Sequence, residues 1–268
     1  MSKPWQTVKS VVFFCMVSSI TLFFYSKLAL QKLLAKFKLL RCTTDEAHMI
    51  ASQWGQTVFR LTPGWRVRII GKENLPGYVD GQGFRERLPF IMVANHESAS
   101  DIFAIYLLQL QFRWLAKAEM FKLPGIGMSM KWSGYVSVDR KDRNSRRTAL
   151  ERSAKILKES TPMLFFPEGT RSTAGQPQKF KAGAFILAKQ LKLPIVPVIL
   201  HGTSHLLKKG SLCPNRAMIT IKVLPAEFSS EEEPEEAFTD RIEQLVRVEH
   251  GRLSYQSSAK ELMSQFVA

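Results

Sequence analysis

A histidine and an aspartate five residues apart stand where an apolar strand is expected to give way to a helix. We expect the strand over Pro89–Ala94 and the helix over Ser100–Gln111, so His96 lies in the turn and Asp101 near the first helical turn. On a continuous helix, residues five apart are separated by about 140° and do not meet. A loop that enters a helix can fold the imidazole back onto the carboxylate. Asp101 would then accept the Nδ1–H of His96 and leave Nε2 free as a general base.

This pair supplies two of the three parts of a hydrolase triad. The missing part is a protein nucleophile, and none is needed if a hydroxyl group of the substrate attacks. Taken alone, a histidine and an aspartate at this spacing are more often a capped loop with satisfied hydrogen bonds than a catalytic site. The elements that position the pair, and the residues that accompany it, therefore decide between the two interpretations.

From Leu88 onward, short apolar strands alternate with helices, which favours an α/β fold with a mostly parallel central sheet flanked by helices. Further strands are expected over Trp65–Ile70, Arg113–Ala116, Tyr135–Val138, Met163–Phe166, Ile195–Leu200 and Met218–Val223. Further helices are expected over Asp45–Leu61, Gly127–Trp132, Asn144–Glu159, Ala182–Leu191 and Glu235–Val248, with a short peripheral helix over Ser257–Ala268.

Polar residues follow each strand of the parallel part, at the point where the strand ends. Besides His96, they are Lys117, Arg140, Glu168, Gly169, Thr170, Arg171 and His201. Because the carboxyl ends of parallel strands share one edge of the sheet, we expect these residues to form one site. The planar guanidinium groups of Arg140 and Arg171 suit a phosphate, although each could instead pair with a neighbouring acidic residue. Gly169 would let the backbone approach a ligand.

The N-terminus is predicted to bind a membrane. Val11–Tyr25 is an uncharged apolar run of 15 residues, and a helix of that length spans about 22 Å of a hydrocarbon core of about 30 Å. Lys27–Arg41 interleaves leucines with lysines, as in a helix that lies among headgroups. We expect residues 1–42 to form two helices that dip into one leaflet, with a buried hairpin or a tilted single span as alternatives. Residues 43–64 would be a linker helix and residues 65–268 the α/β domain.

Composition narrows the class of protein. The chain has 38 Lys and Arg against 23 Asp and Glu, a net charge of +15, and this surplus would attract lipid headgroups, nucleic acid or an acidic carrier. A hydrophobic content of 45% indicates a globular protein rather than a disordered or polytopic one. The 3 cysteines form no close pair and the 5 histidines no HExxH motif, so we expect neither disulfides nor a metal site, and a reducing cytoplasm fits.

Four blocks of sequence resemble those of the glycerolipid acyltransferase family. Residues Asn95–Asp101 are similar to its NHxxxxD motif, and Phe166–Ser172 are similar to its FPEGTRS motif. Gly134–Arg140 resembles the intervening block that ends in arginine, and Ile195–Val198 resembles the hydrophobic block that contains proline. The first block alone would be a weak signal, whereas four blocks in this order are specific.

The resemblance covers about Trp65 to Val223 and is strongest to the bacterial members that acylate 1-acylglycerol 3-phosphate. It implies transfer of a fatty acyl group from acyl-CoA or acyl carrier protein to the 2-hydroxyl of this lysophosphatidic acid, which gives phosphatidic acid. His96 would take the hydroxyl proton while Asp101 orients it, without an acyl-enzyme. By the same resemblance Arg140, Glu168, Gly169 and Arg171 would hold the glycerol phosphate. It also implies no cofactor besides the acyl donor, and a two-helix membrane element at the cytoplasmic face of the inner membrane.

Two other hypotheses stay open. The residues between His96 and Asp101 are small and polar where many family members carry a bulkier one, so the acceptor could be another lysophospholipid or glycerol 3-phosphate. A non-catalytic basic protein on a membrane surface or on nucleic acid would also explain the charge. The sequence contains no recognised nucleic-acid-binding motif, so we expect membrane lipid and no nucleic acid as a partner.

Overall fold

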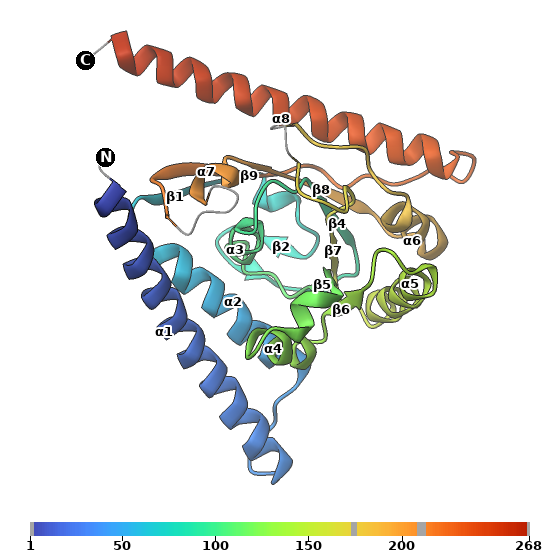
Figure 1. Ribbon diagram of the computed structural model, residues 1–268. Helices are drawn as coiled ribbons and strands as arrows, with labels where there is room; N and C mark the ends of the chain where they lie inside the picture. The colour runs from blue at the N-terminus through green and yellow to red at the C-terminus, as the bar shows by residue number, and fades with distance from the viewer. Residues whose placement is uncertain (1–2, 173–175, 208–212, 267–268) are drawn as a thin grey trace.

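The computed structural model describes residues 3–172, 176–207 and 213–266, and at its centre is a seven-stranded sheet (Figure 1). The strand order is β1-β9-β8-β4-β7-β5-β6. The strands are β1 (Trp65–Ile70), β4 (Ile91–Ala94), β5 (Arg113–Lys117), β6 (Val136–Val138), β7 (Met163–Phe165), β8 (Ile195–His201) and β9 (Ala217–Val223). Strands β8, β4, β7, β5 and β6 are mutually parallel, while β9 is antiparallel to β8 and parallel to β1. The predicted α/β fold with a mostly parallel sheet is confirmed.

Helices cover both faces of the sheet, which explains why its central strands are apolar at every position. Side chains of β4 alternate between the faces: Met92 and Ala94 belong to one hydrophobic core, and Ile91 and Val93 to the other. The first core contains residues of α1 (Lys3–Lys36), α2 (Thr44–Leu61), α3 (Asp101–Tyr106) and α4 (Ile126–Trp132). The second contains residues of α5 (Arg143–Lys158), α6 (Gly183–Leu191) and α8 (Glu235–Phe266). The central strands are therefore shielded from solvent on both sides.

Smaller elements connect these layers. They are α7 (Thr203–Leu206), the 3-10 helices Lys72–Asn74 and Ala118–Lys122, and the two-residue strands β2 (Tyr78–Val79) and β3 (Gly83–Phe84), which form a small hairpin. The helix expected over Ser100–Gln111 ends at Tyr106, and Gln109 adopts a left-handed backbone with φ of 58°. The final helix is longer than expected, because α8 runs from Glu235 to Phe266 and includes most of the separate helix that we expected after it.

The expectation of two N-terminal helices was wrong. One helix, α1, runs from Lys3 to Lys36 (Figure 1), because residues 11–36 contain neither Gly nor Pro to interrupt it. The helix stops just before Lys38, whose φ is 59°. Residues Trp5–Lys36 are long and apolar enough to cross a membrane. A single continuous helix therefore replaces the predicted pair.

One face of α1 packs on the domain, and the other leaves large apolar side chains exposed. Phe13 packs on Trp65 with their ring centroids 5.9 Å apart, and Leu28 is buried against Ile50 of α2. The exposed side chains are Trp5, Val8, Val11, Val12, Phe14, Leu22, Phe23, Leu30 and Leu33. Exposed apolar surface on this scale is typical of a protein or membrane contact. The helix is thus both part of the fold and a candidate membrane anchor.

The packing predicts how strongly α8 contributes to stability. Phe238 is fully buried and its ring meets that of Phe185 edge-on, 5.7 Å between centroids. Replacing it with alanine (Phe238→Ala) leaves a cavity, so we expect the free energy of unfolding to fall by about 3–5 kcal/mol. Urea unfolding of the protein in mild detergent, followed by tryptophan fluorescence, measures the change. Phe228→Ala is the matched control, because Phe228 is 62% exposed, and a loss as large in this control would contradict the interpretation.

Candidate active site

The turn after β4 holds His96 and Asp101 in direct contact. Nδ1 of His96 lies 2.6 Å from Oδ2 of Asp101, and the backbone N–H groups of Glu97 and Ser98 donate to the same oxygen at 2.8 and 3.0 Å. The other oxygen of Asp101 accepts a hydrogen bond from the hydroxyl of Thr203. Asp101 is fully buried, so these donors replace the water that a carboxylate would otherwise need. The carboxylate therefore fixes Nδ1 of His96 as the protonated nitrogen.

The opposite side of the His96 ring is available to a ligand. The ring stacks on Phe166 with centroids 4.4 Å apart, and its side chain is 17% exposed. Among the residues that the structure describes, Nε2 has no hydrogen-bond partner. A neutral imidazole with Nδ1 protonated presents an acceptor at Nε2, which is the atom that a general base needs.

Glu168 holds the backbone of the turn. One of its oxygens accepts the N–H of His96 at 2.7 Å, and the other accepts the N–H of Gln178 at 3.0 Å. The carbonyl of His96 in turn accepts the N–H of Ser172 at 2.8 Å. Burial raises the pKa of the Glu168 carboxyl, against the opposing effect of these amide donors. The family resemblance implied that Glu168 helps to hold the glycerol phosphate; in the structure both of its oxygens bind backbone N–H groups.

Two other predicted residues, Arg140 and Gly169, meet directly beside this turn. The guanidinium of Arg140 donates to the carbonyl oxygen of Gly169. Burial lowers the pKa of Arg140, and Glu119 opposes that shift. Gly169 has a φ of 75°, a left-handed backbone conformation that favours glycine, and Nζ of Lys181 lies beside it. Arg140, Lys181 and the Gly169 turn thus form one positively charged cluster next to His96.

The remaining predicted residues lie on the surface around that cluster. Lys117 is exposed and pairs with Glu119 at 3.1 Å. Thr170 is exposed and its hydroxyl donates to Gln178 at 3.3 Å. Arg171 is exposed, and its guanidinium has no partner within the described part of the chain. The guanidinium of Arg171 is free to turn toward a ligand, whereas Thr170 would first have to leave Gln178 and Lys117 would have to leave Glu119.

The sequence analysis missed residues that hold the turn from other elements. The side chain of Asn95 forms two hydrogen bonds, both 2.8 Å, with the backbone of Leu200 in β8. Glu97 accepts a hydrogen bond from Nε2 of His250 at 2.7 Å, and its other oxygen lies 3.2 Å from the hydroxyl of Thr203. His250 is 153 positions from Glu97 and belongs to α8. No local pattern could have found this pair.

Glu97 and its neighbours are also the described residues best placed to hold a cation. Ligand atoms of Glu97, His201 and His250 lie within 4.8 Å of one another. Two ligands of a tetrahedral zinc ion are about 3.3 Å apart, given bonds of about 2.0 Å. Glu97 and His250 are closer, at 2.7 Å, which is the distance of a direct hydrogen bond. The observed geometry is therefore that of a buried ion pair.

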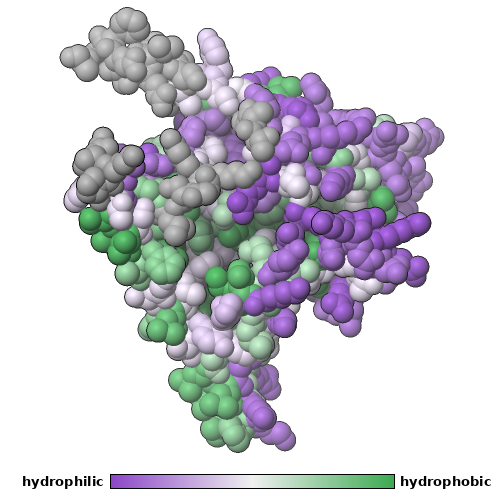
Figure 2. Space-filling model, in the orientation of Figure 1, coloured by the Kyte–Doolittle hydropathy of each residue, from purple (hydrophilic) through white to green (hydrophobic). Residues whose placement is uncertain are grey.

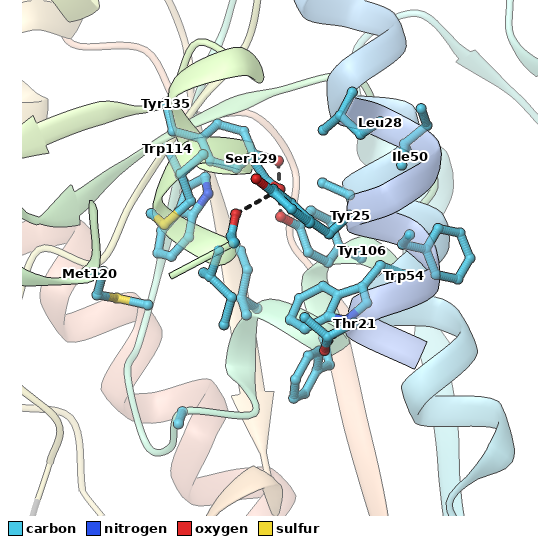
Figure 3. A pocket seen from close by; sticks show the side chains of 18 residues that line it. Thr21, Tyr25, Leu28, Ile50, Trp54, Tyr106, Trp114, Met120, Ser129 and Tyr135 are labelled. Atoms are coloured by element: carbon cyan, nitrogen blue, oxygen red, sulfur yellow. Dashed lines mark hydrogen bonds between the residues drawn. The ribbon is translucent and has the colours of Figure 1, made fainter. Parts of the chain in front are cut away.

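An apolar cavity of about 180 Å³ opens beside the turn (Figure 3). Ala99, which lies between His96 and Asp101 in the sequence, lines it together with side chains from α1, α2, α3 and α4. The hydroxyls of Tyr106 and Tyr135 bond to each other at 2.9 Å, and Tyr135 bonds to His48 at 2.9 Å. Because these polar groups satisfy one another, the walls that they contribute behave as apolar surface.

Comparisons with known proteins agree with this arrangement. A sequence model described as Acyltransferase matches residues 66–201, which is half of the chain. The chain therefore belongs to the acyltransferase family. Several relatives are named 1-acyl-sn-glycerol-3-phosphate acyltransferase. One from Chlamydomonas reinhardtii is 37% identical, and the match covers 66% of this chain and 52% of the relative. One from Limnanthes douglasii is 30% identical, and the match covers 72% of this chain and 74% of the relative. The chain spans about half the length of several such relatives.

A solved structure has the same fold. The crystal structure of the 1-acyl-sn-glycerophosphate (LPA) acyltransferase PlsC from Thermotoga maritima superposes with a TM-score of 0.74. The match covers 95% of this chain and 98% of that one, at 24% sequence identity. The similarity thus extends over α1 and α8 as well as the central sheet.

The Glu97–His250 pair predicts a pH-dependent contribution to stability. Burial by itself raises the pKa of Glu97, but the hydrogen bond and charge of His250 outweigh it, so the pKa lies below its ordinary value of 4.5. The pair therefore stabilises the fold above about pH 4.5 and loses this effect as Glu97 protonates at lower pH. We expect His250→Phe to lower the free energy of unfolding by about 3–5 kcal/mol at pH 7, because it leaves a buried carboxylate unpaired.

Urea unfolding at pH 7 and in increasingly acidic buffers measures this difference, which should shrink as the pH falls below 4.5. His205→Phe is the control, since His205 is exposed. If His250→Phe lowers the free energy of unfolding by the same amount at every pH, the cause is lost packing and not lost charge pairing.

Proposed function

We propose that this protein transfers a fatty acyl group from acyl-CoA or acyl carrier protein to the 2-hydroxyl of 1-acylglycerol 3-phosphate and so produces phosphatidic acid. One observation carries the proposal: the unpartnered Nε2 of His96 lies in the same turn as Ala99, which lines an apolar cavity. The family match and the names of the relatives give the same reaction class and the same acceptor.

In the proposed reaction, Nε2 of His96 takes the proton of the acceptor hydroxyl while that oxygen attacks the thioester carbonyl. Asp101 keeps the Nδ1–H oriented and stabilises the imidazolium that forms. The tetrahedral intermediate then collapses, the carbon–sulfur bond breaks, and the proton on His96 passes to the departing thiolate. Acyl transfer is complete without an acyl-enzyme, a metal or a cofactor other than the acyl donor.

The apolar cavity provides a place for a fatty acyl chain. It lies between α1 and the domain, and four α1 residues line it: Thr21, Phe24, Tyr25 and Leu28. A hydrocarbon chain in contact with these walls would be removed from water, which is favourable by about 0.8 kcal/mol for each buried methylene group. Binding in this cavity would place the carbonyl end of the chain at the His96 turn.

The positively charged cluster provides a place for the acceptor's phosphate. Arg140 is held against Gly169 at the edge of the turn, and the guanidinium of Arg171 has no partner in the described structure. Both guanidinium groups can form paired hydrogen bonds with phosphate oxygens. We assign Gly169 and Thr170 to the same subsite, and Lys117 to its rim.

The proposed reaction takes place at a membrane. The exposed apolar face of α1 would lie in the hydrocarbon layer, which places the cavity beside the lipid phase that supplies the acceptor. We assign the domain to the cytoplasmic face of the inner membrane, where both acyl-CoA and acyl carrier protein are present.

Removing the base tests the mechanism. We expect His96→Ala to lower kcat for acyl transfer by about 10²–10⁴, the usual contribution of general-base catalysis, without loss of folded protein. The assay supplies one labelled acyl donor to a panel of acceptors: 1-acylglycerol 3-phosphate, other lysophospholipids and glycerol 3-phosphate. His205→Ala is the matched control. Full activity of His96→Ala would refute the catalytic role, and preference for another acceptor would refute the proposed substrate.

The phosphate subsite makes a separate kinetic prediction. Since a hydrogen bond to a charged group contributes about 1.5–3 kcal/mol, Arg140→Ala and Arg171→Ala should each raise the KM for 1-acylglycerol 3-phosphate by about 10- to 100-fold. Arg66→Ala removes an equal charge from an exposed site on β1, at the other edge of the sheet, and should leave that KM unchanged. Initial rates over a range of acceptor concentrations distinguish these outcomes, and unchanged acceptor kinetics would remove the arginine from the subsite.

A further inference from the structure

Helix α5 carries exposed cations along its whole length. They are Arg143, Arg146, Arg147, Arg152, Lys155 and Lys158, and the acidic residue within the helix is Glu151. The first turn contains no acidic residue. Asp142 caps the helix, whereas cations in the first turn oppose the helix dipole, which favours negative charge at the N-terminus. Among the described residues, only Arg147 of these cations pairs with an acidic side chain, that of Glu151 at 2.8 Å. Their arrangement instead suits an external anionic partner.

The cationic helix leads to the proposed active site through a second cavity. This cavity, of about 340 Å³, is lined by Arg140, Arg146 and Lys181 together with mostly apolar side chains. Phe166, on which the His96 ring stacks, is also part of its lining. A chain-like group could therefore run from Arg146, near the N-terminal end of α5, past Phe166 to the His96 turn, with an anionic group beside Arg146.

We propose that α5 docks a small acidic protein that carries the fatty acyl group as the thioester of a phosphopantetheine arm. The inference rests on the proposed function and adds to it the preferred donor and the place where it binds. The arm would enter the second cavity with its phosphate near Arg146, which leaves Arg140 and Lys181 to the acceptor's phosphate, and acidic side chains of the carrier would face Arg147, Lys155 and Lys158.

The extent of the charge favours a protein over a nucleotide. Arg143 and Lys158 stand at opposite ends of a 16-residue helix, about 22 Å apart at 1.5 Å per residue. Charges farther apart than the Debye length of about 8 Å at physiological ionic strength act largely independently. The phosphates of one coenzyme A molecule would therefore meet only the cations near the cavity, whereas an acidic protein surface can meet the whole row.

The position of α5 argues against a membrane surface as the occupant. Figure 1 places α1 and α5 on opposite sides of the molecule. Figure 2 shows hydrophobic side chains along the lower left edge, where α1 lies, and hydrophilic ones over the right side around α5 and α6. A bilayer that accepts the exposed apolar face of α1 would leave α5 facing the aqueous phase, which is where a soluble carrier would reach it.

Binding of the carrier to the full chain in nanodiscs of neutral phosphatidylcholine tests the proposal. The probe is an acidic acyl carrier protein that bears its phosphopantetheine arm, labelled for fluorescence anisotropy. The test variant is the triple substitution Arg147→Gln, Lys155→Gln and Lys158→Gln. The control is Arg60→Gln, Arg66→Gln and Arg68→Gln, which removes three equally exposed charges from α2 and β1. Both variants have the same net charge, so any difference in their Kd for the carrier is due to where the removed charges lie.

We expect the α5 variant to raise the Kd for the carrier and the KM for acyl carrier protein by about tenfold, while the KM for acyl-CoA stays within about twofold of its original value. The control variant should change none of these constants by more than about twofold. The proposal would be overturned if both variants weakened binding of the carrier equally, or if the α5 variant did not weaken it. It would also be overturned if the α5 variant raised the KM for acyl-CoA as much as the KM for acyl carrier protein. An α5 variant whose only defect is binding to vesicles that contain anionic lipid would overturn it as well.

The proposed function and the proposed docking surface can fail separately in this experiment. Absence of acyl transfer by the unmodified protein from either donor would contradict the proposed function. Transfer from acyl-CoA without α5-dependent binding of the carrier would leave the function intact and contradict the docking surface.

Discussion

The contact between Nδ1 of His96 and the Asp101 carboxylate is the interaction on which the rest of the site depends. It requires that the chain leave β4, turn once and begin α3 within six residues. Asp101 achieves this by accepting hydrogen bonds from the backbone of the turn as well as from the imidazole. The same carboxylate therefore shapes the loop and sets the tautomer, so the geometry of the His96–Asp101 pair and the local fold cannot vary independently.

Three carboxylates support this turn: Asp101 and Glu168 are buried, and the side chain of Glu97 is only 6% exposed. An unpaired charge in such a place would be strongly unfavourable, but each carboxylate is matched by donors from a different part of the chain. Glu168 binds backbone amides, Glu97 binds His250 of α8, and Asp101 binds Thr203 after β8. Because each donor set satisfies only one placement of its carboxylate, the polar groups specify a single position for the loop.

The sequence predicted much of the sheet and the edge that carries the site, since both follow from local patterns. A short apolar run that ends in polar residues marks a strand of a parallel sheet and its carboxyl end, and five such ends converge here. Other features depend on contacts between distant residues. The pairing of Glu97 with His250, and the two roles of the oxygens of Glu168, result from packing that no spacing encodes. The prediction of two N-terminal helices was wrong for another reason: the change from uncharged to lysine-rich sequence alters the polarity of the helix but does not interrupt it.

The continuity of α1 links the membrane to the site. If α1 were a separate anchor, its only effect would be to raise the local concentration of enzyme at the lipid surface. Instead it contributes Phe24, Tyr25 and Leu28 to the cavity beside His96, while Phe13 packs on Trp65 at the start of β1. A bilayer that holds α1 would therefore also hold one wall of the acyl-chain cavity. On the proposed function, membrane binding and formation of the substrate site are parts of one packing arrangement, and the protein would be fully assembled for catalysis only where its lipid acceptor is found.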